Sequence, residues 1–187
     1  MIQKAFLIAI PEEVKGIDNI LGSPVHYTGV GKVNAAIGAM ELIQRGCTEI
    51  INLGSCGSKK HSVGEIIQIG KSYQDIDCSP ICRYGLTAFE EEAPYIELDP
   101  QHAGTCFSTD YFYHEQYRDK YSPDYLAMIE TCSVFDMELY GIAKVCHKFN
   151  IKLTAYKWVS DDGDFAQWEE NCNLAFHKVE AILSREK

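Results

Sequence analysis

The chain has 187 residues, 46% of them hydrophobic and 24% charged, which is the composition of a globular protein with one sizeable core. Its formal net charge of −10, with no Lys/Arg block, disfavours nucleic acid or an anionic membrane surface as the main partner. The apolar run Ala5 to Ile10 is shorter than a signal-peptide core or a membrane span. We therefore expect a cytoplasmic protein with a single domain over residues 1–187.

The N-terminal half predicts buried strands and one long helix. Lys4 to Ile10 is a short apolar run that predicts a strand, and Pro11 with two following acids predicts a helix start. Gly31 to Cys47 carries apolar residues at helical spacing, which predicts a helix packed on a sheet. Glu49 to Leu53 predicts a second buried strand, stopped by the glycine-rich segment Gly54 to Gly57.

The remaining chain continues this alternation. Strands are predicted at Glu65 to Tyr73, Thr105 to Phe107 and Leu153 to Val159. Helices are predicted at Glu138 to Phe149 and Phe165 to Ser184. The region Asp75 to Asp99, with prolines, glycines and an acidic run, is expected to be mostly loop. The pattern predicts an α/β fold of three layers, in which helices flank a central mixed, mostly parallel sheet.

Eight cysteines lie scattered through apolar segments without the spacing of a disulfide framework, so we expect reduced, mostly buried thiols. Cys78 and Cys82 form one close pair, but no second Cys/His pair at zinc-finger spacing accompanies them. We therefore expect neither a metal nor a cofactor.

Four polar segments lie at predicted strand ends or helix starts, where α/β sheets bind ligands. They are PEEV at 11–14, LGSCG at 53–57, FDME at 135–138 and SDDGD at 160–164. Each segment alone is also explained as a turn or a helix cap. If the sheet assignment is correct, the four converge on one cleft.

In sequence order, IAIPEEV, TGVGKVNAA, NLGSCGS, VGEI, FDMELYGIAKVC and KWVSDD resemble the nucleoside phosphorylase superfamily. The resemblance is closest to its hydrolytic branch, the methylthioadenosine/S-adenosylhomocysteine nucleosidases, and covers most of the chain except about residues 78–103. It implies hydrolysis of the N-glycosidic bond of an adenine-type purine nucleoside to free base and sugar. It also implies a homo-oligomer, with a dimer favoured.

The resemblance assigns roles to the acids because glycosidic cleavage passes through an oxocarbenium-like sugar. Asp161 matches the donor of a proton or hydrogen bond to purine N7, and its neighbours Asp162 and Asp164 are expected to raise its pKa or to serve as helix-start acids. Glu13 matches the base that positions and deprotonates the attacking water. Glu138 matches the glutamate that holds the ribose hydroxyls.

Further site residues follow from the same resemblance. Met137 matches a methionine packed under the sugar, and Ser55 lies near the expected water or anion. Phe112 matches the aromatic residue that stacks on the base, and Tyr113 offers backbone contacts. Asp136 stands where close relatives usually carry glutamate.

Charge favours water over phosphate as the nucleophile. A phosphorylase binds dianionic phosphate, usually with arginines, whereas Asn52 stands where resembling phosphorylases carry arginine. Glu12 and Glu13 would repel phosphate, and Lys32 and Lys157 are explained by helix and strand positions. A phosphate-dependent phosphorylase and a catalytically silent nucleoside-binding module stay as alternatives, as do futalosine-type substrates.

Two other motif interpretations fit poorly. VSDDGD lacks the ligand spacing and twelfth-position glutamate of a calcium-binding EF-hand loop. GVGKVN lacks the third glycine of a dinucleotide-binding motif, where Asn34 stands.

The chain is also shorter than typical relatives. It is expected to lack a hairpin before Gly29 and a helix between Glu92 and Thr105, which leaves the 5′ substituent of the substrate open.

Overall fold

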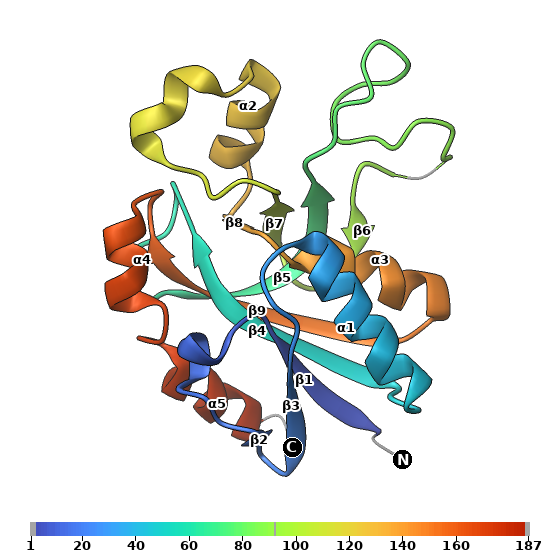
Figure 1. The fold of residues 1–187 in the computed structure, drawn as a ribbon, viewed down its shortest axis with the longest axis vertical. Helices are drawn as coiled ribbons and strands as arrows, with labels where there is room; N and C mark the ends of the chain where they lie inside the picture. Colours follow the sequence, from blue (N-terminus) through green and yellow to red (C-terminus); the bar gives the residue numbers. More distant parts are fainter. Residues whose placement is uncertain (1–2, 92, 186–187) are drawn as a thin grey trace.

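Within the part of the chain that the structure describes, nine strands form a central sheet (Figure 1). The computed structural model describes residues 3–91 and 93–185, so Glu92 of the acidic run lies outside the described residues. The strands are β1 Lys4–Ile8, β2 Asn19–Ile20, β3 Ser23–Tyr27, β4 Glu49–Gly57, β5 Ile66–Gln74, β6 Ile96–Glu97, β7 Gly104–Ser108, β8 Val134–Asp136 and β9 Lys152–Asp161. The α-helices are α1 Lys32–Gln44, α2 Pro123–Thr131, α3 Leu139–Phe149, α4 Phe165–Asn171 and α5 Phe176–Arg185, with short 3-10 helices η1 Pro11–Val14 and η2 Glu115–Lys120.

The sheet is mixed and partly closed on itself. Parallel ladders join β3, β1, β4 and β9, and a second parallel set joins β5, β7 and β8. The two sets meet through antiparallel pairing of β9 with β5 and of β4 with β8. The strands β4, β9, β5, β7 and β8 therefore form a closed circuit, from which β1, β3 and β2 extend on one side and β6 on the other.

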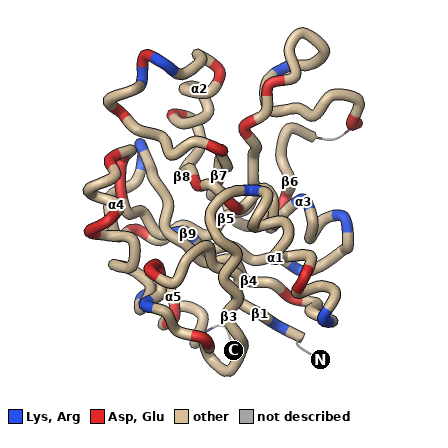
Figure 2. Tube along the Cα trace, in the orientation of Figure 1, with Lys and Arg blue, Asp and Glu red and all other residues tan. Residues whose placement is uncertain are grey.

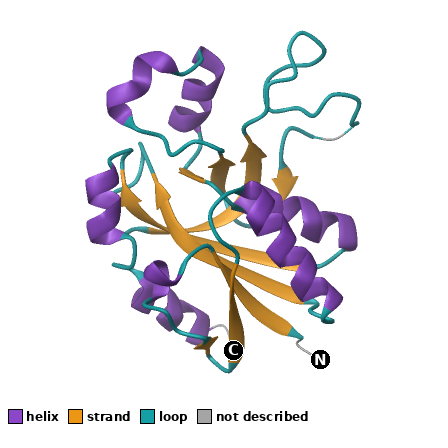
Figure 3. Cartoon of the chain, viewed as in Figure 1, coloured by secondary structure: helices purple, strands orange, loops and turns teal. Residues whose placement is uncertain are grey.

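Helices cover both faces of the extended part of the sheet, as the alternating side chains of β1 require. Phe6 and Ile8 belong to a buried cluster with Val179 and Leu183 of α5. Residues of β1 on the opposite face pack with α1 and α3. Figure 3 shows these helices on either side of the strands. The predicted three-layer α/β class is confirmed.

The packing of α1 on α3 depends on glycine. A Cβ built on Gly141 of α3 would lie 2.2 Å from the backbone oxygen of Lys32, at the first turn of α1. Only a residue without a side chain permits this approach of the two backbones. The contact brings the start of α1 to the start of α3, where the predicted sugar-binding residues lie.

Several predicted boundaries were wrong. β4 runs through the glycine segment to Gly57, and the helix expected at Pro11 is a single 3-10 turn. The predicted helix Phe165 to Ser184 is two helices, α4 and α5. The hairpin expected to be missing before Gly29 is present in short form, because β2 and β3 pair antiparallel.

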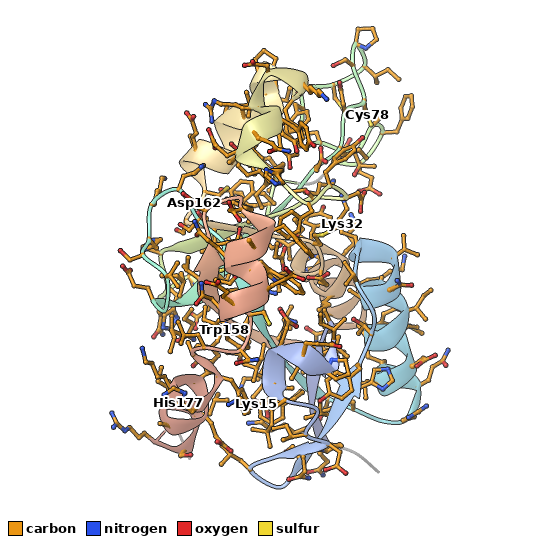
Figure 4. The ribbon with its side chains drawn as sticks, turned by 60° about the vertical axis from the view of Figure 1, so that its left-hand side comes forward. Lys15, Lys32, Cys78, Trp158, Asp162 and His177 are labelled. Carbon is orange, nitrogen blue, oxygen red and sulfur yellow. The ribbon has the colours of Figure 1, made fainter. Side chains whose placement is uncertain are left out.

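The middle of the chain agrees better with expectation. Residues 75–91 carry no helix or strand, and the described residues between 93 and 103 contain only the two-residue β6. Cys78 lies on this loop at the top of Figure 4. The eight cysteines are free in the structure, and six of them are buried, which confirms the predicted burial of most of them. Among the described residues, no helix is long and apolar enough to cross a membrane.

Candidate active site

A cavity of about 520 Å³ opens where the four polar segments meet. All eight residues predicted for the site line it, so the expected convergence is confirmed, although their roles stay predictions. The lining residues are Ala9, Ile10, Glu13, Val30, Ser55, Cys56, Gly57, Tyr111, Phe112, Tyr113, His114, Tyr117, Phe135, Asp136, Met137, Glu138, Asp161, Phe165 and Trp168.

Gly57 explains why these segments meet. At the end of β4 it pairs with Asp161 of β9 and also with Phe135 of β8. A Cβ on Gly57 would lie 2.0 Å from the ring of Phe135, so the approach needs glycine. The glycine segment thus joins strand ends through the backbone, where a turn was predicted.

Glu13 is held at the floor of the cavity by Ser55. Its Oε1 accepts hydrogen bonds from the backbone N–H and the hydroxyl of Ser55, each at 2.7 Å. Its Oε2 is buried and has no hydrogen-bond partner among the described residues. Burial raises the pKa of Glu13, although Lys157 and the Ser55 hydrogen bonds counteract the shift. A carboxylate with one free oxygen and a raised pKa suits a base that takes a proton from water.

Lys157 and Asp136 form a buried ion pair beneath the cavity. Lys157 Nζ lies 2.8 Å from Asp136 Oδ2, and both side chains are 1% exposed. The Ser108 hydroxyl donates to the other Asp136 oxygen at 2.6 Å, and the Leu139 N–H donates to Oδ2 at 2.9 Å. Burial opposes ionisation of Asp136, but Lys157 and these hydrogen bonds outweigh it and lower its pKa. Both oxygens of Asp136 are therefore engaged within the protein.

The predicted strand position of Lys157 is correct, but its side chain turns inward beneath the carboxylates. Burial lowers the pKa of Lys157, yet Asp136 and Glu138 outweigh this and raise it, so the ammonium stays charged. Sequence reasoning missed this role. The residue types alone gave no signal, since a lysine inside a strand is normally exposed.

Glu138 is fixed by the segment before α1. Its Oε1 accepts a hydrogen bond from the N–H of Gly31 at 2.9 Å, and its Oε2 accepts from Met137 at 3.3 Å. Gly31 has φ of 100°, a conformation that favours glycine. Burial and the nearby Asp136 raise the pKa of Glu138 to about 7. The GVGKVN motif therefore serves to orient this carboxylate, and is not a dinucleotide loop.

Asp161 ends β9 at the opposite side of the cavity. Its oxygens accept hydrogen bonds from the Ser160 hydroxyl and the Gly163 N–H, each at 2.8 Å. Burial raises its pKa, and Asp162 adds to the shift, as expected. Asp164 instead lowers the pKa through its backbone and caps α4, with Oδ1 accepting from the N–H of Ala166 and Gln167. Figure 4 shows Asp162 at the upper end of α4.

Aromatic rings form the remaining wall. Phe112 is 37% exposed and meets Phe165 edge-on, with ring centroids 5.6 Å apart. The ring of Tyr113 is buried, and its hydroxyl donates a hydrogen bond to Glu115. Phe165 and Trp168 were not predicted for the site. Their spacing of three residues on a helix directly after the acidic turn could have indicated them.

Positive charge is scarce at the cavity. Among the described residues, none that lines it is Lys or Arg. Lys32 lies 3.1 Å from Asp110 and donates to the carbonyl of Asp75. Acidic positions gather around α4 in Figure 2. The described residues contain no group of three side chains suited to hold a metal ion.

Comparisons with known proteins find relatives of this chain. The profile of the Phosphorylase superfamily matches residues 22–185. The chain is 30% identical to a 5′-methylthioadenosine/S-adenosylhomocysteine nucleosidase of Buchnera aphidicola, over 83% of this chain and 75% of that protein.

Solved structures share the fold. The Helicobacter pylori 5′-methylthioadenosine/S-adenosylhomocysteine nucleosidase superposes with a TM-score of 0.81 at 22% identity, covering 98% of this chain and 97% of the other. The futalosine hydrolase of the same organism gives 0.79 at 20% identity, covering 98% and 96%.

Proposed function

Because the chain belongs to the phosphorylase superfamily and is related to its nucleosidases, we propose that it hydrolyses the N-glycosidic bond of an adenine-type nucleoside. The observation that carries the proposal is the placement of Glu13, Glu138 and Asp161 around one cavity, each carboxyl in a different environment. The named relatives support a methylthioadenosine-like or S-adenosylhomocysteine-like substrate. Free cysteines support a reducing compartment, which we take to be the cytoplasm.

The proposed reaction divides its work among these carboxyl groups. Asp161, protonated, donates to purine N7 while the glycosidic electron pair passes to the base. Glu138 holds the ribose hydroxyls as positive charge develops on the sugar. Glu13 takes a proton from the water that attacks the anomeric carbon. Lys157, paired with Asp136, places a buried positive charge close to Glu13 and Glu138.

The hydrogen-bonding groups of Asp161 support an aminopurine as the base of the substrate. The carboxyl of Asp161 can face both N7 and an exocyclic amine, whereas an asparagine would suit a 6-oxopurine. Phe112 and Tyr113 both line the cavity, which supports the proposal that they contact the base. A futalosine-type nucleoside is the second candidate, because a futalosine hydrolase shares this fold.

Hydrolysis is expected to be independent of phosphate. A panel of purine nucleosides is incubated with the protein in phosphate-free buffer, and released base is measured by mass spectrometry. Since no Lys or Arg among the described residues lines the cavity, adding phosphate should change the rate by less than about 2-fold and yield no ribose 1-phosphate. A requirement for phosphate would identify a phosphorylase. Release of no base from any nucleoside would identify a silent binding module.

A homodimer formed through α1 is expected in solution. Val33 and Ile37 on this helix are 72% and 55% exposed, and the nearby Val30 belongs to the rim of the cavity. Light scattering should give twice the chain mass of 21.1 kDa. Replacing Val33 and Ile37 by Asp should give monomers, while Lys178→Asp on the exposed side of α5 should not. A monomeric wild-type protein would contradict the proposal.

A further inference from the structure

We propose that Trp168 is a positioning residue that orients the hydroxyl of Ser55 toward Glu13, an inference that rests on the proposed nucleosidase function. The indole Nε1–H of Trp168 donates to Ser55 Oγ at 3.1 Å. The Ser55 hydroxyl donates in turn to Glu13 Oε1 at 2.7 Å. These contacts join a helix covering the cavity to the carboxylate on its floor.

The direction of this chain of hydrogen bonds follows from the donors available. An indole N–H donates and cannot accept, so it occupies a lone pair of Ser55 Oγ and leaves the hydroxyl proton for Glu13. Together with the Ser55 backbone N–H, that proton saturates Glu13 Oε1. The second oxygen, Oε2, has no hydrogen-bond partner among the described residues. Trp168 thus helps to decide which oxygen of Glu13 carries the hydrogen bonds of Ser55 and which oxygen keeps a free lone pair.

Helix α4 carries Trp168 to this place by packing that does not involve Ser55. Asp164 caps the helix, and the rings of Phe165 and Trp168 stack with centroids 5.5 Å apart. Phe165 also meets Phe112, the predicted base-stacking residue. The indole therefore has two separable functions, ring packing against Phe165 and hydrogen bonding to Ser55.

Trp168→Phe separates these functions, since it keeps a ring and removes the N–H. We expect kcat to fall by about 2- to 10-fold, the worth of one hydrogen bond, with KM within about 2-fold of wild type. The acid limb of the pH profile should also move to higher pH, because a weaker Ser55 hydrogen bond stabilises ionised Glu13 less. Lys157 on β9 and Glu138 before α3 also act on Glu13, as do the titratable side chains of Tyr27, Cys56 and Cys172, and all of them are unchanged in the variant.

A double-mutant cycle tests whether Trp168 acts through Ser55. In a Ser55→Ala background, Trp168→Phe should reduce kcat no further. Additive losses, or a Trp168→Phe enzyme with wild-type kcat and pH profile, would overturn the inference. If Trp168→Phe unfolds, the benzothiophene analogue of tryptophan placed at position 168 keeps the shape without the N–H, and the same losses are expected. Base release by the wild type is measured first, because its absence would refute the proposed function instead.

Discussion

Replacing Asp161 by asparagine should lower kcat by about 10²- to 10⁴-fold, the usual contribution of a positioned general acid. The amide keeps the size of the side chain and can donate a hydrogen bond to the base, but it cannot deliver a proton as the glycosidic bond breaks. KM should change much less than kcat, because the amide can still donate a hydrogen bond to the base, although an asparagine suits a 6-oxopurine better than an aminopurine. Steady-state release of base from the best nucleoside of the panel measures both constants.

Asp162 provides a matched control for this variant. It is the next residue in the chain, is exposed, and does not line the cavity. Asp162→Asn removes one negative charge from the same turn, and it should slightly lower the pKa of Asp161, which Asp162 helps to raise. We expect it to keep turnover within about 3-fold of wild type. Equal losses in the two variants would show that the charge of the turn matters and that Asp161 is not the proton donor.

Replacing Glu13 by glutamine should cause a loss of similar size, because water then has no base at the anomeric carbon. The wild-type pH profile should carry the signature of this group. Glu13 acts ionised and burial raises its pKa, so activity should fall with decreasing pH at a higher pH than an exposed glutamate would give. The glutamine variant should lose this acid limb in its residual activity.

Glu12→Gln is the corresponding control. Glu12 precedes Glu13 in the same 3-10 turn but is exposed and does not line the cavity. Its replacement should leave kcat and the acid limb unchanged. Turnover by Glu13→Gln within about 3-fold of wild type would require another base for the attacking water.

Sequence patterns predicted the buried strands and long helices well. They failed where contacts with residues distant in sequence determine the local conformation. The glycines from Gly54 to Gly57 look locally like a turn. In the structure they stay within β4, because Gly54 lies against Glu13 and Lys157 and Gly57 lies against the ring of Phe135. Whether a glycine bends the chain or makes room for another segment depends on residues far away in sequence.

The candidate site was predicted by combining motifs, because no single segment was informative. The resemblance placed Glu13, Glu138 and Asp161, and the structure brings them together. The positions of Lys157 and Trp168 at the site were not predicted, because a pattern of residue types does not show which way a side chain points. The helix α2 was also missed, although Ser122 before Pro123 is a sequence signal for a helix start, and the Ser122 side chain caps it.

The closed circuit of strands also bears on how copies of the chain can associate. Strands with unpaired edges invite edge-to-edge pairing and aggregation. Here the ends of the described sheet are β2 and β6, each only two residues long, and the strands between them have a neighbour on both sides over at least part of their length. Strand addition is therefore a poor route to assembly, and we expect refolding from concentrated solution to yield helix-mediated dimers and little fibrillar material.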